Sequence, residues 1–167
     1  AEFPPRPVVI HFSFRDARPG ESAWWLLVEQ GVADLMLHLG AERGQLGVVA
    51  DQFGGPTPAA AIADALWQLA QVCRQQPEQL WGIYHFAGQP ACSWHAFAEE
   101  IFRQALELGL LAKAPQVNAI STADYPTPAR RPAWSVLDNS AFTRDFGVHI
   151  GDWHEGLDEV LDLLAQA

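Results

Sequence analysis

Short β-branched or aromatic segments alternate along this chain with longer amphipathic segments, and this alternation restricts the folds available to it. Strand-like patterns occupy residues 8–14, 47–50, 82–87 and 117–121. Apolar residues recur at helical spacing over residues 31–39, 58–76, 93–109, 139–147 and 152–165. Strands that alternate with helices favour an α/β (α+β-like) domain, a small sheet with flanking helices, over a helical bundle or a β-sandwich.

Residues that satisfy free backbone groups mark the expected helix ends. Thr57 precedes Pro58, which predicts an N-cap followed by proline at the first helical position. The other signals are Ser93 and either Asp138 or Asn139 as N-caps, Asp152 with Glu155 as a capping box, and Gly40, Gly109 and Gly147 as closing glycines. These signals place most of the helix boundaries.

Composition excludes several classes of function. The 167 residues favour one domain with a real core, since 49% of them are hydrophobic, and no apolar run approaches the length of a membrane span. A formal charge of -10 disfavours binding to nucleic acid. With Cys73 and Cys92 as the only cysteines and no secretion signal at the beginning, we expect reduced thiols and a cytoplasmic protein.

The densest positive charge lies in the stretch from Asp124 to Asp138, where Arg130 and Arg131 are neighbours among Pro126, Pro128 and Pro132. Proline fixes φ and excludes helix, so the two guanidiniums belong to a stiff, extended loop. They can clamp a phosphate or a carboxylate. A solvated connector is the other interpretation, and the residues alone favour it.

Four segments, in order, resemble one family. They are Val48-Val49-Ala50-Asp51-Gln52-Phe53-Gly54-Gly55-Pro56-Thr57, Gly82-Ile83-Tyr84-His85-Phe86-Ala87-Gly88, Ser93-Trp94-His95-Ala96-Phe97-Ala98, and the arginine loop through Leu137-Asp138. Together they are similar to the C-terminal, sugar-binding half of dTDP-4-dehydrorhamnose reductase, an extended short-chain dehydrogenase. The resemblance implies a sugar-nucleotide-binding domain over 31–167 and leaves 1–30 unassigned.

The resemblance also assigns roles to single residues. It implies that Arg131, or secondly Arg130, contacts the diphosphate of a dTDP-sugar, and that Asp51 and Gln52 line the sugar-nucleotide cleft. For Asp51, fixing the turn is an equally good interpretation. Trp134 stands where the family has small or polar residues, and packing is favoured over stacking on a base.

The family reduces a dTDP-4-keto-6-deoxyhexose with NADPH or NADH, and two parts that this reaction needs are not found in the sequence. One is a glycine-rich nucleotide-binding turn, and the other is a Tyr-x-x-x-Lys pair. Lys113 is the only lysine, and Gly88 and Ala129 stand four residues after Tyr84 and Tyr125. We therefore expect that this chain binds no cofactor and transfers no hydride alone.

A second hypothesis is a non-catalytic interaction or sugar-nucleotide-binding module. Trp24, Trp25, Leu26 and Leu27 form an apolar cluster that can cover the surface facing a nucleotide-binding half or a second copy. The expected partners are thus a separate nucleotide-binding half or, in a homo-oligomer, a second copy that forms a dimer.

A zinc site built from His85, Cys92 and His95 is disfavoured, because no fourth ligand has suitable spacing. The acidic residues after Gly151 are expected on the solvated face of the last helix. No magnesium site is assigned to them.

Overall fold

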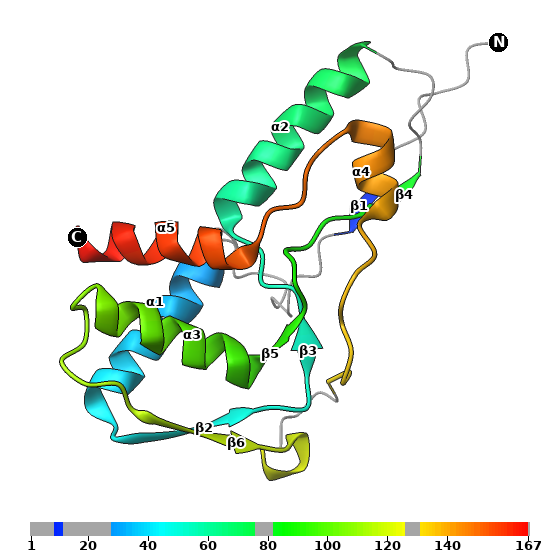
Figure 1. Cartoon of the computed structure of the whole chain (residues 1–167). Coiled ribbons are helices and arrows are strands. Elements are labelled where there is room, and N and C mark those ends of the chain that lie inside the picture. The colour runs from blue at the N-terminus through cyan, green and yellow to red at the C-terminus, as the bar shows by residue number, and fades with distance from the viewer. Residues whose placement is uncertain (1–8, 12–27, 76–81, 126–130, 167) are drawn as a thin grey trace, which may run out of the picture.

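A computed structural model describes residues 9–11, 28–75, 82–125 and 131–166 (Figure 1). Its elements are β1 (Val9–His11), α1 (Val28–Glu42), β2 (Gln45–Val49), β3 (Phe53–Gly54), α2 (Ala59–Gln75), β4 (Ile83–His85), β5 (Cys92–Ser93), α3 (Trp94–Glu107), β6 (Gln116–Ile120), the 3-10 turn η1 (Thr122–Asp124), α4 (Ser140–Phe146) and α5 (Trp153–Ala165). Strands and helices alternate as predicted. No described helix has both the length and the apolar character needed to span a membrane.

The strands form three small pairs. β2 and β6 are parallel, with Gln45 opposite Gln116 and Val49 opposite Ile120. β1 pairs with β4 in parallel, and β3 pairs with β5 in antiparallel orientation. Because parallel neighbours need a crossover, the helices α2 and α3 fall between β2 and β6 in the sequence.

Two packed regions make up the molecule (Figure 1). In one, α1, α3 and α5 pack on each other and on β2, around fully buried residues that include Ile101, Phe102 and Leu161. In the other, α2 and α4 enclose β4 around an aromatic cluster of Tyr84, Phe86, Phe142 and Phe146. The described chain therefore has a helical layer over β2–β6 and an aromatic region beside it.

Helix α1 continues past the glycine that was expected to end it. Gly40 lies inside α1, which ends at Glu42. A Cβ at residue 40 would come within 2.5 Å of the Phe102 ring. The prediction of a closing glycine was wrong because this glycine serves the close packing of α1 against α3.

Two backbone segments cross where the packed regions meet. A Cβ at Gly55 would collide with the Gly88 carbonyl oxygen, and one at Gly88 would collide with the carbonyl of Pro56. The Thr57 hydroxyl accepts from Gly88 N at 2.9 Å and donates to Gly55 O at 2.9 Å. Helix α2 begins at Ala59, so Pro58, whose carbonyl accepts from Ile62 N, occupies the cap position predicted for Thr57.

The other predicted caps are present with small differences. Ser93 Oγ accepts from Ala96 N, and Gly109 (φ 72) and Gly147 (φ 67) adopt left-handed conformations after α3 and α4. Asp138 Oδ1 accepts from Ser140 N, while the Asn139 side chain bonds both backbone groups of Ala87. Asp152 caps α5 through the amide of His154, one residue earlier than a capping box requires.

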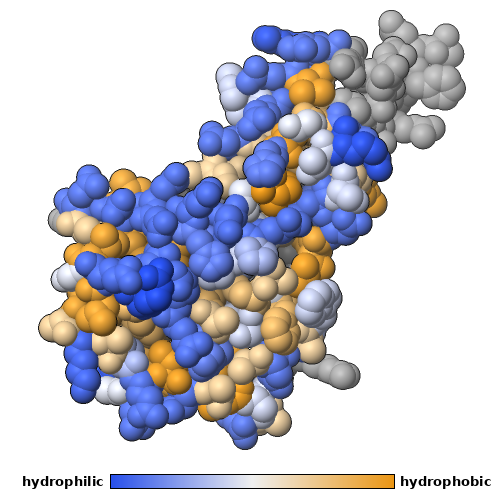
Figure 2. Space-filling model, viewed as in Figure 1, coloured by the Kyte–Doolittle hydropathy of each residue, from blue (hydrophilic) through white to orange (hydrophobic). Residues whose placement is uncertain are grey.

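The acidic face of the last helix is solvated, as predicted. Figure 2 shows a hydrophilic band along α5. Its acidic residues are all exposed, namely Asp152, Glu155, Asp158, Glu159 and Asp162.

Candidate functional site

The turns that follow β2 and β6 meet at one edge of the molecule, because these strands are parallel neighbours. Ala50 N donates to Ile120 O at 2.9 Å, which extends the ladder by one residue. The chain then enters Asp51-Gln52 on one side and η1 on the other. The sequence-predicted residues Asp51 and Gln52 are thus placed directly beside the start of the arginine loop.

The Asp51 carboxylate holds the beginning of η1. Thr122 N donates to Oδ1 and Oδ2 at 2.9 and 3.0 Å, and Thr122 Oγ1 donates to Oδ1 at 2.6 Å. The hydroxyl bond and then the amide bond stabilise the charged carboxylate, so they lower the pKa of Asp51. Asp51 is exposed and fixes the turn, which is one of its two predicted roles.

Gln52 is buried beside the same threonine. Its side chain is 7% exposed, and its Nε2 donates to Thr122 Oγ1 at 3.1 Å. Its carbonyl accepts from Trp94 N at 3.3 Å, which ties the turn to the start of α3. Thr122 Oγ1 therefore accepts a hydrogen bond from Gln52 and donates one to Asp51, so both predicted residues are bonded to the same hydroxyl.

A second carboxylate closes the turn. Asp124 Oδ2 accepts from Ser121 Oγ at 2.6 Å and from Ser121 N at 3.0 Å. The bond from the hydroxyl, followed by that from the amide, lowers the pKa of Asp124, while the neighbouring Asp51 charge acts in the opposite direction. Two ionised carboxylates at this edge repel an anion, so anion binding here requires the guanidiniums that follow.

The far end of the arginine loop is held by the next residue of the same turn, Phe53. Phe53 N donates to Ala133 O at 2.8 Å, and Phe53 O accepts from Ser135 N at 2.9 Å and from Ser135 Oγ at 2.8 Å. Thr122, before the arginine loop, and residues 133–135, at its far end, are thus both bonded to the consecutive residues 51–53. Arg131 lies half-buried within it, and Arg130 lies outside the described residues.

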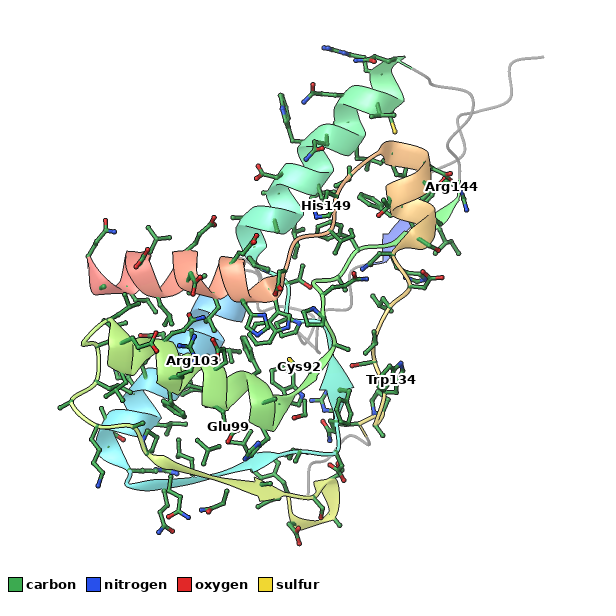
Figure 3. The ribbon with its side chains drawn as sticks, viewed as in Figure 1. Cys92, Glu99, Arg103, Trp134, Arg144 and His149 are labelled. Atoms are coloured by element: carbon green, nitrogen blue, oxygen red, sulfur yellow. The ribbon has the colours of Figure 1, made fainter. Side chains whose placement is uncertain are left out.

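An aromatic pair occupies the outer surface of this anchor. The rings of Phe53 and Trp134 lie 5.8 Å apart with an interplanar angle of 34°. Trp134 is 65% exposed and Phe53 is 37% exposed, and Figure 3 places Trp134 on the outer segment beside β3. Packing was the favoured role for Trp134. Its ring does contact Phe53, but most of the residue is exposed to solvent.

Sequence reasoning missed Thr122, Phe53 and Ser135 as parts of this site. Thr122 stands two positions after the end of β6, just as Asp51 stands two positions after the end of the neighbouring strand β2. Polar residues at the carboxyl ends of adjacent parallel strands are the signal that points to such a pair. For Phe53 and Ser135 the sequence carries no comparable signal.

His95 and Cys92, considered above as zinc ligands, lie in surroundings that do not favour a metal site. His95 Nδ1 lies 3.1 Å from Glu99 Oε2, and its Nε2 lies 3.4 Å from Val117 O. Burial raises the pKa of the Cys92 thiol to about 11, so the thiolate that zinc prefers is disfavoured. Across the described ranges, no three His, Cys, Asp or Glu side chains are grouped so that they could hold a metal ion.

Comparison with known proteins gives consistent matches. The family model for the RmlD substrate binding domain matches residues 23–166. A dTDP-4-dehydrorhamnose reductase of Aggregatibacter actinomycetemcomitans is 44% identical over 138 residues, which cover 81% of this chain and 47% of that protein. The chain thus spans about half the length of the curated relatives it matches.

Solved structures agree with this assignment. The dTDP-4-dehydrorhamnose reductase of Clostridium acetobutylicum matches with a TM-score of 0.71 at 28% identity, covering 94% of this chain and 48% of that one. The enzyme of Bacillus anthracis, solved in complex with NADP, matches with a TM-score of 0.68 at 25% identity, over 92% and 46% of the two chains. The resemblance seen in the four sequence segments and the predicted fold class are both confirmed.

Proposed function

This chain belongs to the family of RmlD substrate binding domains, and on that premise we propose that it is the sugar-nucleotide-binding half of a dTDP-4-dehydrorhamnose reductase. The whole enzyme then reduces a dTDP-4-keto-6-deoxyhexose with NADPH or NADH, a step in making dTDP-L-rhamnose. The nucleotide-binding half that supplies the cofactor is a necessary partner. This chain contributes the surface that recognises the substrate.

The ligand binds, in this proposal, at the edge formed by residues 51–53, η1 and the arginine loop. Arg131 contacts the diphosphate, with Arg130 as the second cation, because a guanidinium can bind phosphate oxygens through two parallel hydrogen bonds. The observation that carries the proposal is the attachment of both ends of the arginine loop to one three-residue turn. A cation held on such a loop loses little conformational entropy on binding.

Gln52 and Asp51 complete the site by shaping it. The Asp51 carboxylate and the Gln52 amide hold the Thr122 hydroxyl from two sides, which sets the direction in which the loop leaves β6. Asp51 is exposed, so its carboxylate also lies at the surface that a sugar hydroxyl can approach. Gln52 is buried, so its contribution is chiefly to hold the turn.

Calorimetric titration with dTDP and with dTDP-L-rhamnose tests the assignment of Arg131. Losing one charge-assisted contact in Arg131→Ala should weaken binding by on the order of 1.5 to 3 kcal/mol. Arg74→Ala is a matched control, since Arg74 is an exposed arginine in the last turn of α2. Equal binding by wild type and Arg131→Ala would reject the diphosphate contact, and no binding by wild type would reject the function itself.

Hydride transfer by this chain alone is not expected, and the surroundings of Tyr84 support that view. Tyr84 is 5% exposed and its hydroxyl donates to Asp145 Oδ2 at 2.9 Å. Burial, and then the bond to Asp145, raise the pKa of Tyr84, which makes its phenolate harder to form. Oxidation of NADPH by the isolated chain with a dTDP-4-keto sugar would contradict this proposal.

Self-association is a second candidate function, and helix α2 provides the observation that favours it. Besides its buried face, α2 carries a second apolar stripe of exposed residues at helical spacing, namely Ala63, Leu66, Trp67 and Ala70. Such a stripe can pair with its own copy across a two-fold axis, burying Leu66 and Trp67 of both chains. Light scattering coupled to gel filtration should show a dimer, and a monomer at high concentration would reject it.

A further inference from the structure

The rings of Phe53 and Trp134 are exposed, so they contribute little to the core of the fold. Tryptophan side chains are highly buried on average, yet 65% of Trp134 is exposed. Its ring lies 5.8 Å from the ring of Phe53, which is itself 37% exposed. A large aromatic surface is therefore presented to solvent at the candidate site.

The pair is held by backbone bonds, so its position does not depend on side-chain packing. Ala133 O and Ser135 N, on either side of Trp134, both bond the backbone of Phe53, at 2.8 and 2.9 Å. Trp134 is thus bridged to Phe53 in the manner of a short parallel strand pair. An aromatic ring fixed in this way loses little entropy when a ligand stacks on it.

The surroundings of the pair suit a small ligand better than a protein surface. The residues next to the rings in sequence are small or polar, and Ala133 and Ser135 are exposed, as is Asp51. Among the described residues, the two rings and their polar neighbours in sequence form a small patch, whereas protein interfaces typically present a continuous apolar area. One planar ring, such as a nucleobase, matches this patch in size and character.

Arg131 lies within reach of the same ligand. It precedes Trp134 by three residues, a separation that cannot exceed about 10 Å even in a fully extended chain. A cation and an aromatic ring at this spacing fit a molecule that carries phosphates at one end and a planar ring at the other. Nucleoside diphosphates have this form.

We propose that Trp134, supported by Phe53, stacks on the nucleobase of the ligand whose diphosphate Arg131 binds. The inference rests on the proposed function, because it takes the diphosphate contact of Arg131 as given. Every base has a π-face, so a stacking surface supplies affinity with little choice between bases. We therefore expect dTDP and UDP to bind with affinities within a few-fold of each other.

Calorimetric titration with inorganic pyrophosphate and with dTDP separates the two contacts. In Trp134→Ala, affinity for dTDP should fall roughly tenfold or more, the range found when a stacking aromatic is removed, while affinity for pyrophosphate stays unchanged. Trp134→Phe should retain most of the dTDP affinity. Leu163→Ala is the control, because Leu163 is a large apolar residue that is 56% exposed on α5, and it should bind both ligands as wild type does.

Each outcome decides between the two proposals. If Arg131→Ala loses both ligands while Trp134→Ala binds dTDP as wild type does, the stacking role is overturned and the proposed function stands. If wild type binds neither ligand, the stacking role and the proposed function are both rejected. Weaker self-association of Trp134→Ala with unchanged dTDP binding would identify the pair as a protein contact and overturn the inference. Circular dichroism and thermal unfolding of each variant verify that the fold is retained.

Discussion

The two ends of the arginine loop are anchored to neighbouring residues by different kinds of bond. The first anchor, made by Asp51, Gln52 and Thr122, depends on side chains and on one carboxylate charge. The second, between Phe53 and residues 133–135, depends mainly on backbone amides and carbonyls. We therefore expect one end of the loop to respond to pH and to single substitutions, and the other end to resist both.

Thr122→Val should break the first anchor, and of the changes proposed here it should lower stability and dTDP affinity the most. Valine has the shape of threonine but leaves the buried Gln52 amide without this acceptor and Asp51 without one donor. Loss of partners by a buried polar group costs about 1–3 kcal/mol in the free energy of unfolding, measurable by urea denaturation. Affinity for dTDP should fall in parallel.

Thr122→Ser is the control for that experiment, because it keeps the hydroxyl and should retain most of the stability. If Thr122→Val were as stable as wild type and bound dTDP equally well, the first anchor would have no energetic role.

Acid should loosen the first anchor and leave the second unchanged. The pKa of Asp51 is lowered from 3.8 in the folded chain, so its bonds stabilise the fold above that value and are lost as the pH falls through the lower folded pKa. The amide proton signal of Thr122 should therefore shift in an NMR titration over this acidic range. The amide of Ser135, whose acceptor is a carbonyl, should not.

Asp51→Asn serves as the matched variant, since it cannot ionise and should abolish the response of Thr122. Equal shifts at residues 122 and 135 would show that acid unfolds the whole edge instead.

Ser135→Ala should have the smallest effect. It removes one hydroxyl bond to Phe53 O, while the two backbone bonds of the second anchor remain. We expect a loss of no more than about 1 kcal/mol in the free energy of unfolding, and dTDP affinity within twofold of wild type. A loss as large as that of Thr122→Val would remove the distinction between the anchors.

Local signals explain what the sequence predicted correctly. Ser93, Gly109 and Gly147 act within one helical turn of themselves, so their roles could be recognised without the fold. The strands 45–49 and 116–120 were also predicted within two residues at each end. Gly40 was misinterpreted because its partner, Phe102, is distant in the sequence.

The site was predictable only in part for the same reason. Asp51 and Gln52 were recognised through a family motif, but their bonds to Thr122 join residues 71 and 70 positions apart. The pairing of Phe53 with Ser135 spans 82 positions. No local pattern encodes such contacts, because they arise from the parallel pairing of β2 with β6 and from the path of the loop.

The crossing of residues 55–56 over Gly88 has a consequence for how tolerant this sequence is to change. A library randomised at residues 53–57 and selected only for folding should return glycine at 55, since any side chain there meets the backbone of Gly88. Selection for ligand binding would add no further constraint at that position. The close contact of the two backbone segments thus explains Gly55 in this chain, and phosphate binding is not needed to account for it.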